Sequence, residues 1–452
     1  MQKEIDNYVK QFEAAQTPSE PAWLGVLRRK AIERFAKTGF PSVKDEQWKH
    51  TNLAPIASLP FARDGMGSGA ISPQDVSTCV SGAYANHLLV FINGRYSSRL
   101  SRPGPLPEGV RLCPLSEVLE ENPALVEAPF ARLTEKPVAP VADTNPFTAL
   151  NTAFMEDGAV VILPMGAVVK TPIYLVFLST GATGATGATG SQKPWIACPR
   201  NLIIAGENSQ ASIVEYYLGT GATGATGVAP YFNNAVTGLL VGENAVIHHD
   251  KIQEEALSSF HIASLEVDQG PSSRFVSNYV SLGGSLSANR IHARLNATGC
   301  DCALNGLYLG GGSQHMDSHT LIDHLKPNGT SNELYKGILG GRSRGVFDGK
   351  IVVHKEAQKT HAHQTNKNLL LSAEAEADPA PQLEIFADDV KVGHGSTVGR
   401  LDENQIFYLR SRGIGEKEAK GLLVSSFAGD VIEKIGVPAI KSRVKEVLSE
   451  RI

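Results

Sequence analysis

Short apolar segments bounded by Gly, Asn or Pro fill most of the chain after residue 88, and this pattern constrains the fold most strongly. Their period of two predicts β-strands. The clearest cases are residues 160–163, 173–178, 201–204, 211–214, 238–241, 245–248, 274–276, 291–295, 306–309, 346–353 and 383–386. No helical pattern of roughly 10–15 residues separates them, which excludes βαβ units. A sandwich, a barrel, a propeller or a solenoid remains.

A faint internal repeat favours the solenoid. The segment Gly-Glu-Asn occurs at residues 206–208 and again at 242–244, each time just before an expected strand. The spacing of 36 residues corresponds to about two coils of roughly 18 residues. Gly and Asn suit tight corners because both tolerate the left-handed conformation. We therefore predict a right-handed parallel β-helix of roughly ten coils or more, with an ordinary β-sandwich as the alternative.

Helical periodicity marks both ends of the chain. Ile5, Tyr8 and Phe12 recur at helical spacing near the start, and residues 1–55 are predicted to be largely helical. From about residue 402 one apolar face returns, formed by Ala419, Leu422, Leu423, Phe427, Val431, Ile432 and Ile435, and a second by Ile440, Val444, Val447 and Leu448. The predicted organisation is a helical region and linker over 1–87, a β-helix over 88–400 and a C-terminal helical domain over 401–452, whose apolar faces must pack on the β-helix or on another protein.

Two low-complexity segments of Gly, Ala and Thr interrupt the strands at residues 181–190 and 219–227. Such segments bury no core, so we predict exposed loops at both places.

Composition excludes several classes of function. The net charge is −4 and no basic cluster occurs, so neither nucleic acid nor an anionic membrane is an expected partner. Five thinly spread cysteines argue against a disulfide framework. No signal peptide and no long apolar run is present, and we expect a cytoplasmic protein. Gly349-Lys350 is followed by Ile351, which fails the P-loop pattern, so the chain is expected to have no ATP site.

Candidate metal ligands occur in several places. His361 and His363 would share one face of a strand with His354 nearby. Two other groups have metal-ligating residue types at short spacing, namely His315, His319 and His324, and Cys300 and Cys302. For all of them a structural role, as surface histidines or core-facing thiols, is the stronger expectation.

Two enzymatic alternatives stay open on the residues alone. An exported β-helix enzyme acting on carbohydrate needs paired acids on one face, whereas Asp388 and Asp389 would point to opposite faces of a strand. A cupin-like metal enzyme using His361 and His363 would need a Glu about four residues further on, where Lys367 stands.

Long ordered strings in the C-terminal third resemble the SufB/SufD family of iron–sulfur cluster assembly proteins, and the SufD branch most closely. The strings span residues 365–372, 381–391, 394–399 and 407–414, and residues 46–53 are similar to the N-terminal segment of that branch.

The resemblance implies a non-catalytic scaffold with a right-handed parallel β-helix and helical domains at both ends. It implies pairing with a SufB-like subunit through the β-helices and docking of a SufC-like ABC-type ATPase on the C-terminal helices. Iron or an iron–sulfur cluster would be held transiently in the complex, which is also expected to bind reduced flavin. This chain alone is expected to bind no cofactor stably. A homodimer of the isolated chain is compatible with an open strand edge.

The resemblance also assigns residues. His394 matches a family histidine implicated in iron handling at the subunit interface, whereas the cysteine that is common two residues earlier is replaced by Val392. The residues implied for partner docking are Phe407, Tyr408, Leu409, Arg410, Arg412, Gly413, Ile414 and Phe427.

Overall fold

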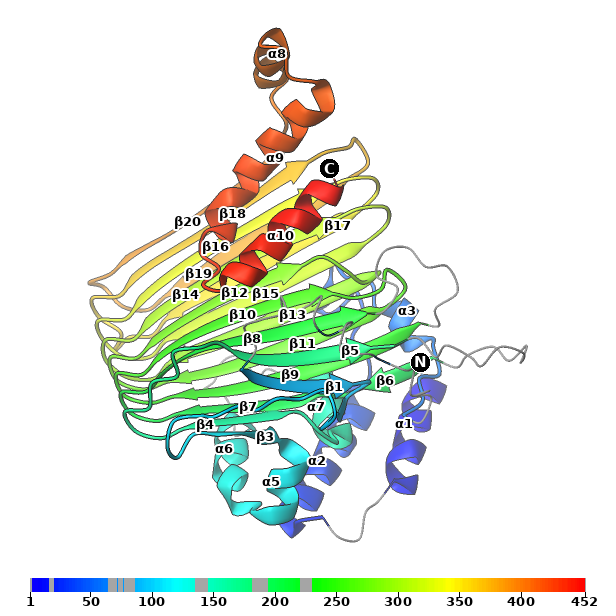
Figure 1. Ribbon diagram of the computed structural model, residues 1–452, viewed down its shortest axis with the longest axis vertical. Helices are drawn as coiled ribbons and strands as arrows, with labels where there is room; N and C mark the ends of the chain where they lie inside the picture. The colour runs from blue at the N-terminus through cyan, green and yellow to red at the C-terminus, as the bar shows by residue number, and fades with distance from the viewer. Residues whose placement is uncertain are drawn as a thin grey trace.

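The computed structural model describes residues 2–15, 20–63, 71, 76, 86–134, 145–180, 194–219 and 230–451. The chain is mainly β and forms a parallel β-solenoid of about 6 turns with helices at both ends (Figure 1). The predicted fold class is confirmed. The two Gly-Ala-Thr segments lie outside the described residues, except for Gly219, which ends a strand.

In the described part of the chain, twenty strands build the body. The first ten are β1 (His87–Ile92), β2 (Arg95–Tyr96), β3 (Arg111–Pro114), β4 (Ala159–Leu163), β5 (Ile173–Ser179), β6 (Trp195–Ala197), β7 (Arg200–Ala205), β8 (Gln210–Gly219), β9 (Tyr231–Val241) and β10 (Val246–Glu254). The others are β11 (Phe260–Gln269), β12 (Arg274–Ser281), β13 (Leu286–Leu295), β14 (Asp301–Gly310), β15 (His315–His324), β16 (Thr330–Leu339), β17 (Arg344–Val353), β18 (His361–Leu370), β19 (Glu376–Ile385) and β20 (Lys391–Arg400).

Two ten-stranded sheets face each other. The β20 sheet has the order β2-β1-β5-β8-β10-β12-β14-β16-β18-β20, and the β19 sheet has the order β19-β17-β15-β13-β11-β9-β7-β4-β3, with β6 beside β9. From β7 onward successive strands alternate between the sheets, so each of these turns adds one strand to each. We call the space enclosed between the sheets the lumen.

The turns are longer than the sequence repeat suggested. Gln210 lies opposite Val246 in the parallel pair of β8 and β10. The two Gly-Glu-Asn segments are therefore one turn apart, and the prediction of ten or more short coils was wrong. A turn contains two strands and two corners, whereas the 18-residue estimate allowed for only about half of that.

Asn at the corners has the conformation that the sequence predicted. Asn208 and Asn244 both have positive φ, 57° and 53°. The amide of Asn208 donates to the carbonyl of Glu243 at 2.8 Å, and the amide of Asn244 donates to that of Pro271 at 2.9 Å. Each corner thus bonds to the next turn, and the backbone ladder continues through the bends.

Aromatic stacking fills the first turns of the lumen. The rings of Phe91 and Phe177 lie 4.9 Å apart, and those of Phe177 and Tyr217 lie 4.6 Å apart, nearly parallel in both pairs. In-register stacking places these side chains above one another, as a parallel solenoid requires.

Helices cover the N-terminal end of the solenoid and part of the outer face of the β19 sheet (Figure 1). They are α1 (Gln2–Ala14), α2 (Ala22–Thr38), the short 3₁₀ helix η1 (Glu46–Trp48), α3 (Ala54–Ala57), α5 (Leu115–Glu121), α6 (Ala124–Thr134) and α7 (Pro146–Phe154). The last three lie between β3 and β4, where no helix was predicted. Every residue of α7 except Thr148 is buried, so it has no amphipathic period, and α6 contains Pro129.

The C-terminal helices α8 (Glu403–Ser411), α9 (Glu416–Ile432) and α10 (Pro438–Arg451) divide into a free part and an attached part. Apolar residues from Val424 onward pack on the outer face of the β20 sheet with Leu307 and Ile338. The hairpin of α8 and the start of α9 projects beyond the body (Figure 1). Among the described residues, no helix combines the length and apolarity that crossing a membrane requires.

Lys336 fixes α9 to the β20 sheet. Its Nζ donates to the carbonyl of Phe427 at 2.7 Å and to Asp430 Oδ2 at 2.6 Å, and it lies 4.9 Å from the centre of the Phe427 ring. The side chain is only 3% exposed. A second attachment comes from Asn278, whose Nδ2 donates to the carbonyl of Lys434.

Replacing Lys336 by Met is expected to loosen α9, because the apolar stem stays while the bonds to α9 are lost. We expect a loss of about 1–3 kcal/mol in the free energy of unfolding and faster amide hydrogen exchange in 424–435. Lys355→Met, the same change at an exposed corner position away from α9, is the control and should shift stability by less than about 0.5 kcal/mol. Equal exchange in both variants would contradict this role.

Candidate functional site

The solenoid ends in two strands that each have a neighbour on one side only. β20 pairs with β18, β19 pairs with β17, and no further strand follows either in the described part of the chain. Several large apolar side chains are exposed around this end, namely Leu371, Ile385, Phe386 and Val398. We call the two strands and these side chains the open end.

His394 lies in the middle of β20 and faces the lumen side. Val392, two residues earlier on the same face, packs against the lumen core, and Ala362, its register partner on β18, is buried there. His394 itself is exposed because no turn covers it, and its register partner is Gln364. The predicted ligand therefore sits at the mouth of the lumen.

A buried polar pair lies directly beneath His394. Gln364 pairs in register with Glu333 on β16, both are 0% exposed, and Gln364 Nε2 donates to Glu333 Oε2 at 2.5 Å. Burial raises the pKa of the Glu333 carboxyl to about 7. Among the described residues, Gln364 Oε1 has no hydrogen-bond partner.

The C-terminal hairpin presents the second candidate surface. Ile406 and Ala419 are buried, whereas Phe407 is 74% exposed and Tyr408 is 57% exposed. The Arg412 guanidinium lies 5.2 Å from the centre of the Tyr408 ring. An aromatic pair with an adjacent Arg is the residue combination enriched at binding hot spots.

The other docking candidates differ in exposure. Arg410 and Arg412 are exposed, Leu409 and Ile414 are half-buried, and Gly413 forms the turn with φ 88°. Arg410 pairs with Glu416 at 3.5 Å, which joins α8 to α9. Phe427 lies farther along α9, where its ring covers Lys336.

The predicted histidine group of 354–363 is not assembled. His361 and His363 are exposed on the outward face of β18, where His363 Nε2 meets Thr365 Oγ1 at 3.1 Å. His354 is held elsewhere, with its Nε2 3.4 Å from Asp323 Oδ1.

The group of three histidines on β15 has structural partners. Thr51 donates to Asp317 and lies 2.8 Å from His315 Nε2, while His319 Nε2 lies 2.8 Å from the other oxygen of Asp317. These contacts hold the N-terminal segment against the β19 sheet. His324 is fully buried, and burial lowers its pKa to about 4.

Cys300 and Cys302 belong to the lumen core. Both are at most 1% exposed, and burial raises the pKa of each thiol, so both stay protonated and unreactive. Among the residues that the structure describes, no three His, Cys, Asp or Glu side chains are arranged to hold a metal ion.

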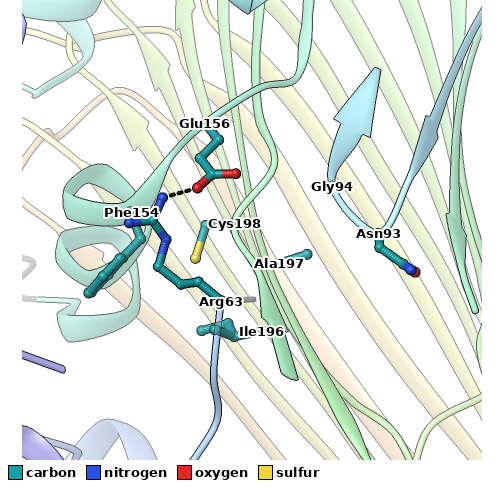
Figure 2. Close-up of a pocket in the computed structure, with 8 residues that line it drawn as sticks. All are labelled: Arg63, Asn93, Gly94, Phe154, Glu156, Ile196, Ala197 and Cys198. Carbon is teal, nitrogen blue, oxygen red and sulfur yellow. Dashed lines mark hydrogen bonds and ion pairs between the residues drawn. The ribbon is translucent and has the colours of Figure 1, made fainter. Parts of the chain in front are cut away.

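A small pocket near the first turns holds about 20 Å³, room for about one water molecule. Figure 2 shows Arg63 paired with Glu156 beside the Phe154 ring, with the Cys198 thiol behind them. Burial raises the pKa of that thiol to about 12, so it is not a nucleophile. The pocket is too small for a cofactor.

Sequence reasoning missed Glu333 and Gln364, which lie 31 residues apart. It also missed a polar group deeper in the lumen, where Glu215 accepts from Thr237 and meets His249 at 3.2 Å. Only the register of the turns brings these residues together. The one available signal was the position of Gln364 immediately before the string at 365–372.

Comparison with known proteins gives consistent results over the whole chain. The model of the SufBD core domain of the SUF system for iron–sulfur cluster assembly matches residues 188–427, and that of the SufBD N-terminal region matches residues 2–175. An iron–sulfur cluster assembly SufBD family protein of Synechocystis is 31% identical, covering 100% of this chain and 96% of its own.

Two proteins named SufD are similar over nearly full length. The iron–sulfur cluster assembly protein SufD of Escherichia coli is 28% identical over 98% of this chain and 95% of its own. That of Bacillus subtilis is 25% identical over 98% of this chain and 97% of its own.

Glu333→Gln is expected to change how stability depends on pH. The folded protein holds the carboxyl proton more tightly than the unfolded chain, with a pKa of about 7 against 4.5. The resulting stabilisation is complete below pH 4.5 and is lost as the pH rises through 7. The variant should therefore gain about 3 kcal/mol in unfolding free energy relative to the unchanged chain between pH 4.5 and pH 8.

Urea unfolding at both pH values measures this difference. Glu374→Gln, which removes an exposed carboxyl near the open end, is the control. A Glu333→Gln effect that is the same at both pH values would show that the buried carboxyl does not titrate in this range.

Proposed function

Since the chain belongs to the SufBD family of iron–sulfur cluster assembly proteins, we propose that it is a scaffold subunit that pairs with a SufB-like protein through the open end. In the same proposal the C-terminal hairpin holds a SufC-like ABC-type ATPase, and the chain itself hydrolyses no ATP. The observation that carries the proposal is the unpaired edge of β20, next to which the hairpin begins.

The free edge of β20 offers an uninterrupted row of backbone hydrogen-bonding groups for another strand. The backbone amide of Lys391 donates to the carbonyl of Thr360, next to β18. In a parallel ladder alternate residues bond to the same neighbour, so the odd residues of β20 bond to β18. The backbone amides and carbonyls of the even residues, from Val392 to Arg400, point away from β18, toward the free edge of the sheet. None is Pro, so all five can bond to a partner strand.

The free edge of β19 is different. The backbone amides of Glu376 and Phe386 donate to the carbonyls of Ser343 and Val353, on the side of β17. The backbone groups of the odd residues of β19 therefore point toward the free edge. Two of these are Pro379 and Pro381, which have no amide hydrogen to give. Strand addition is therefore favoured at β20, which carries His394, and disfavoured along the middle of β19.

The hairpin presents exposed aromatic side chains suited to binding the proposed ATPase. Its Phe407 and Tyr408 are exposed on a helix whose inner side is closed by Ile406. Only Leu401 and Asp402 separate it from β20, and Asp402 caps α8 by accepting from the amide of Asn404. The two proposed contacts are thus connected directly through the backbone.

Iron or a nascent cluster is the proposed cargo at the open end. His394 offers one imidazole, and Val392 offers no thiolate. A single imidazole holds iron weakly, so the partner subunit must supply the remaining ligands. A site divided between two subunits exists only when they are paired, which explains how the cargo can be held transiently.

Phe407→Glu is expected to weaken ATPase docking at least tenfold, because hot-spot aromatic residues contribute about 2 kcal/mol or more. Gln405→Glu adds the same charge to another exposed position of α8 and should leave docking unchanged. Pull-down and titration with the ATPase measure both variants. Equal affinity for the two would place the ATPase elsewhere.

His394→Ala is expected to lower cluster yield without loss of the complex, because the side chain is exposed and supports no packing. Anaerobic reconstitution with the partner subunits, followed by iron and sulfide counts, measures the yield. His363→Ala, on the outward face of the neighbouring strand, is the matched control. A normal yield from His394→Ala would remove His394 from the proposal.

A further inference from the structure

We propose that Gln364 is a positioning residue for His394, whose imidazole donates one N–H to the Gln364 amide oxygen and so turns its other nitrogen toward the partner subunit. This inference rests on the proposed function, in which that nitrogen binds iron. It adds two residues, Gln364 and Glu333, that neither sequence patterns nor family membership assigns.

The register of the last two turns brings the groups together. Glu333 lies opposite Gln364, and Gln364 lies opposite His394, on strands that are neighbours in the β20 sheet. Paired parallel strands lie about 4.8 Å apart, and their register partners point to the same face. An imidazole on β20 is therefore within reach of the end of a Gln side chain on β18.

Glu333 determines which end of the amide faces His394. Above about pH 7 Glu333 is a carboxylate, which only accepts hydrogen bonds, so the Gln364 Nε2 group faces it and donates to Oε2 at 2.5 Å. The amide oxygen then remains as the free end. Gln364 is 0% exposed, yet this oxygen has no hydrogen-bond partner.

Leaving a buried acceptor without a donor destabilises the folded protein. A donor for it can come from the next turn, which for Gln364 is the last strand of the solenoid, β20. His394 is the residue of β20 that stands opposite Gln364. An imidazole N–H from this position would satisfy the acceptor.

The wall facing Gln364 is shaped to admit the amide. Gly349 on β17 has no side chain, and a Cβ there would lie 2.3 Å from Gln364 Nε2 and 2.6 Å from the tip of the Phe347 ring. The amide therefore occupies space that any other residue at position 349 would fill. The amide nitrogen of Gln364 is thus packed against the backbone of Gly349 on one side and bonded to Glu333 on another.

The chemistry matches a common feature of metal-binding histidines. Such residues donate their second ring N–H to a carbonyl or carboxylate, which fixes the tautomer and the ring orientation. Here the Gln364 side-chain carbonyl is the acceptor for the His394 N–H, and the hydrogen bond from Gln364 Nε2 to Glu333 orients the amide. His363, on the outward face, has only the Thr365 hydroxyl beside it.

The test uses ¹⁵N-histidine NMR of the isolated chain at pH 8.5, with His394→Ala to identify the signals of His394. We expect one dominant tautomer in the unchanged chain and a mixture of both in the Gln364→Leu variant. The double variant Glu333→Gln, Gln364→Glu exchanges donor and acceptor within the pair and keeps an oxygen toward His394, so it should restore the single tautomer. His363 should be unaffected in all variants.

A second readout uses the reconstituted complex. Gln364→Leu should lower the affinity for Fe²⁺ by about 10- to 100-fold while subunit pairing is unchanged, and the double variant should recover most of the loss. An unchanged tautomer ratio in Gln364→Leu overturns the positioning role. Normal iron binding by His394→Ala overturns only the proposed ligand role, so the two failures can be told apart.

Discussion

The parallel backbone ladder that joins each turn of the solenoid to the next is the interaction on which the rest of this molecule depends. It stacks lumen side chains in register, continues through corners such as Asn208 and Asn244, and supplies the surface on which α9 and α10 pack. A ladder of this kind has no internal means of ending. The first turns are covered by helices, whereas the last turn leaves β19 and β20 open.

The free edges of β19 and β20 differ in their capacity for backbone hydrogen bonding. Pro379 and Pro381 remove outward donors from β19, while the outward positions of β20 stay intact. A chain under selection only against aggregation would protect both edges. The asymmetry is consistent with an edge reserved for one partner, and β20 also carries His394 and leads within two residues to the hairpin.

Much of the fold could be predicted, because strand period and corner chemistry are local. The Gly-Glu-Asn corners and the buried face of α10 follow from short-range pattern. On α9 the pattern predicted Val431 and Ile432 correctly, but Leu422 is exposed and Val424 is buried. Resemblance, not pattern, singled out His394. Register is not local. The turn from Gln210 to Val246 is longer than that from Arg274 to Asp301, so no fixed period could align Glu333, Gln364 and His394. The helix α7 escaped notice because burial on all sides removes the amphipathic signal.

The central claim is that β20 is the strand through which this subunit is assembled. Amide hydrogen exchange of residues 391–400, compared between the isolated chain and its complex with a SufB-like partner, tests it most directly. The account predicts strong protection of this segment on pairing, because the outward amides of Val392, His394, Ser396, Val398 and Arg400 gain acceptors, with little change in 376–385. Unchanged exchange in 391–400 in a complex that forms normally would contradict it.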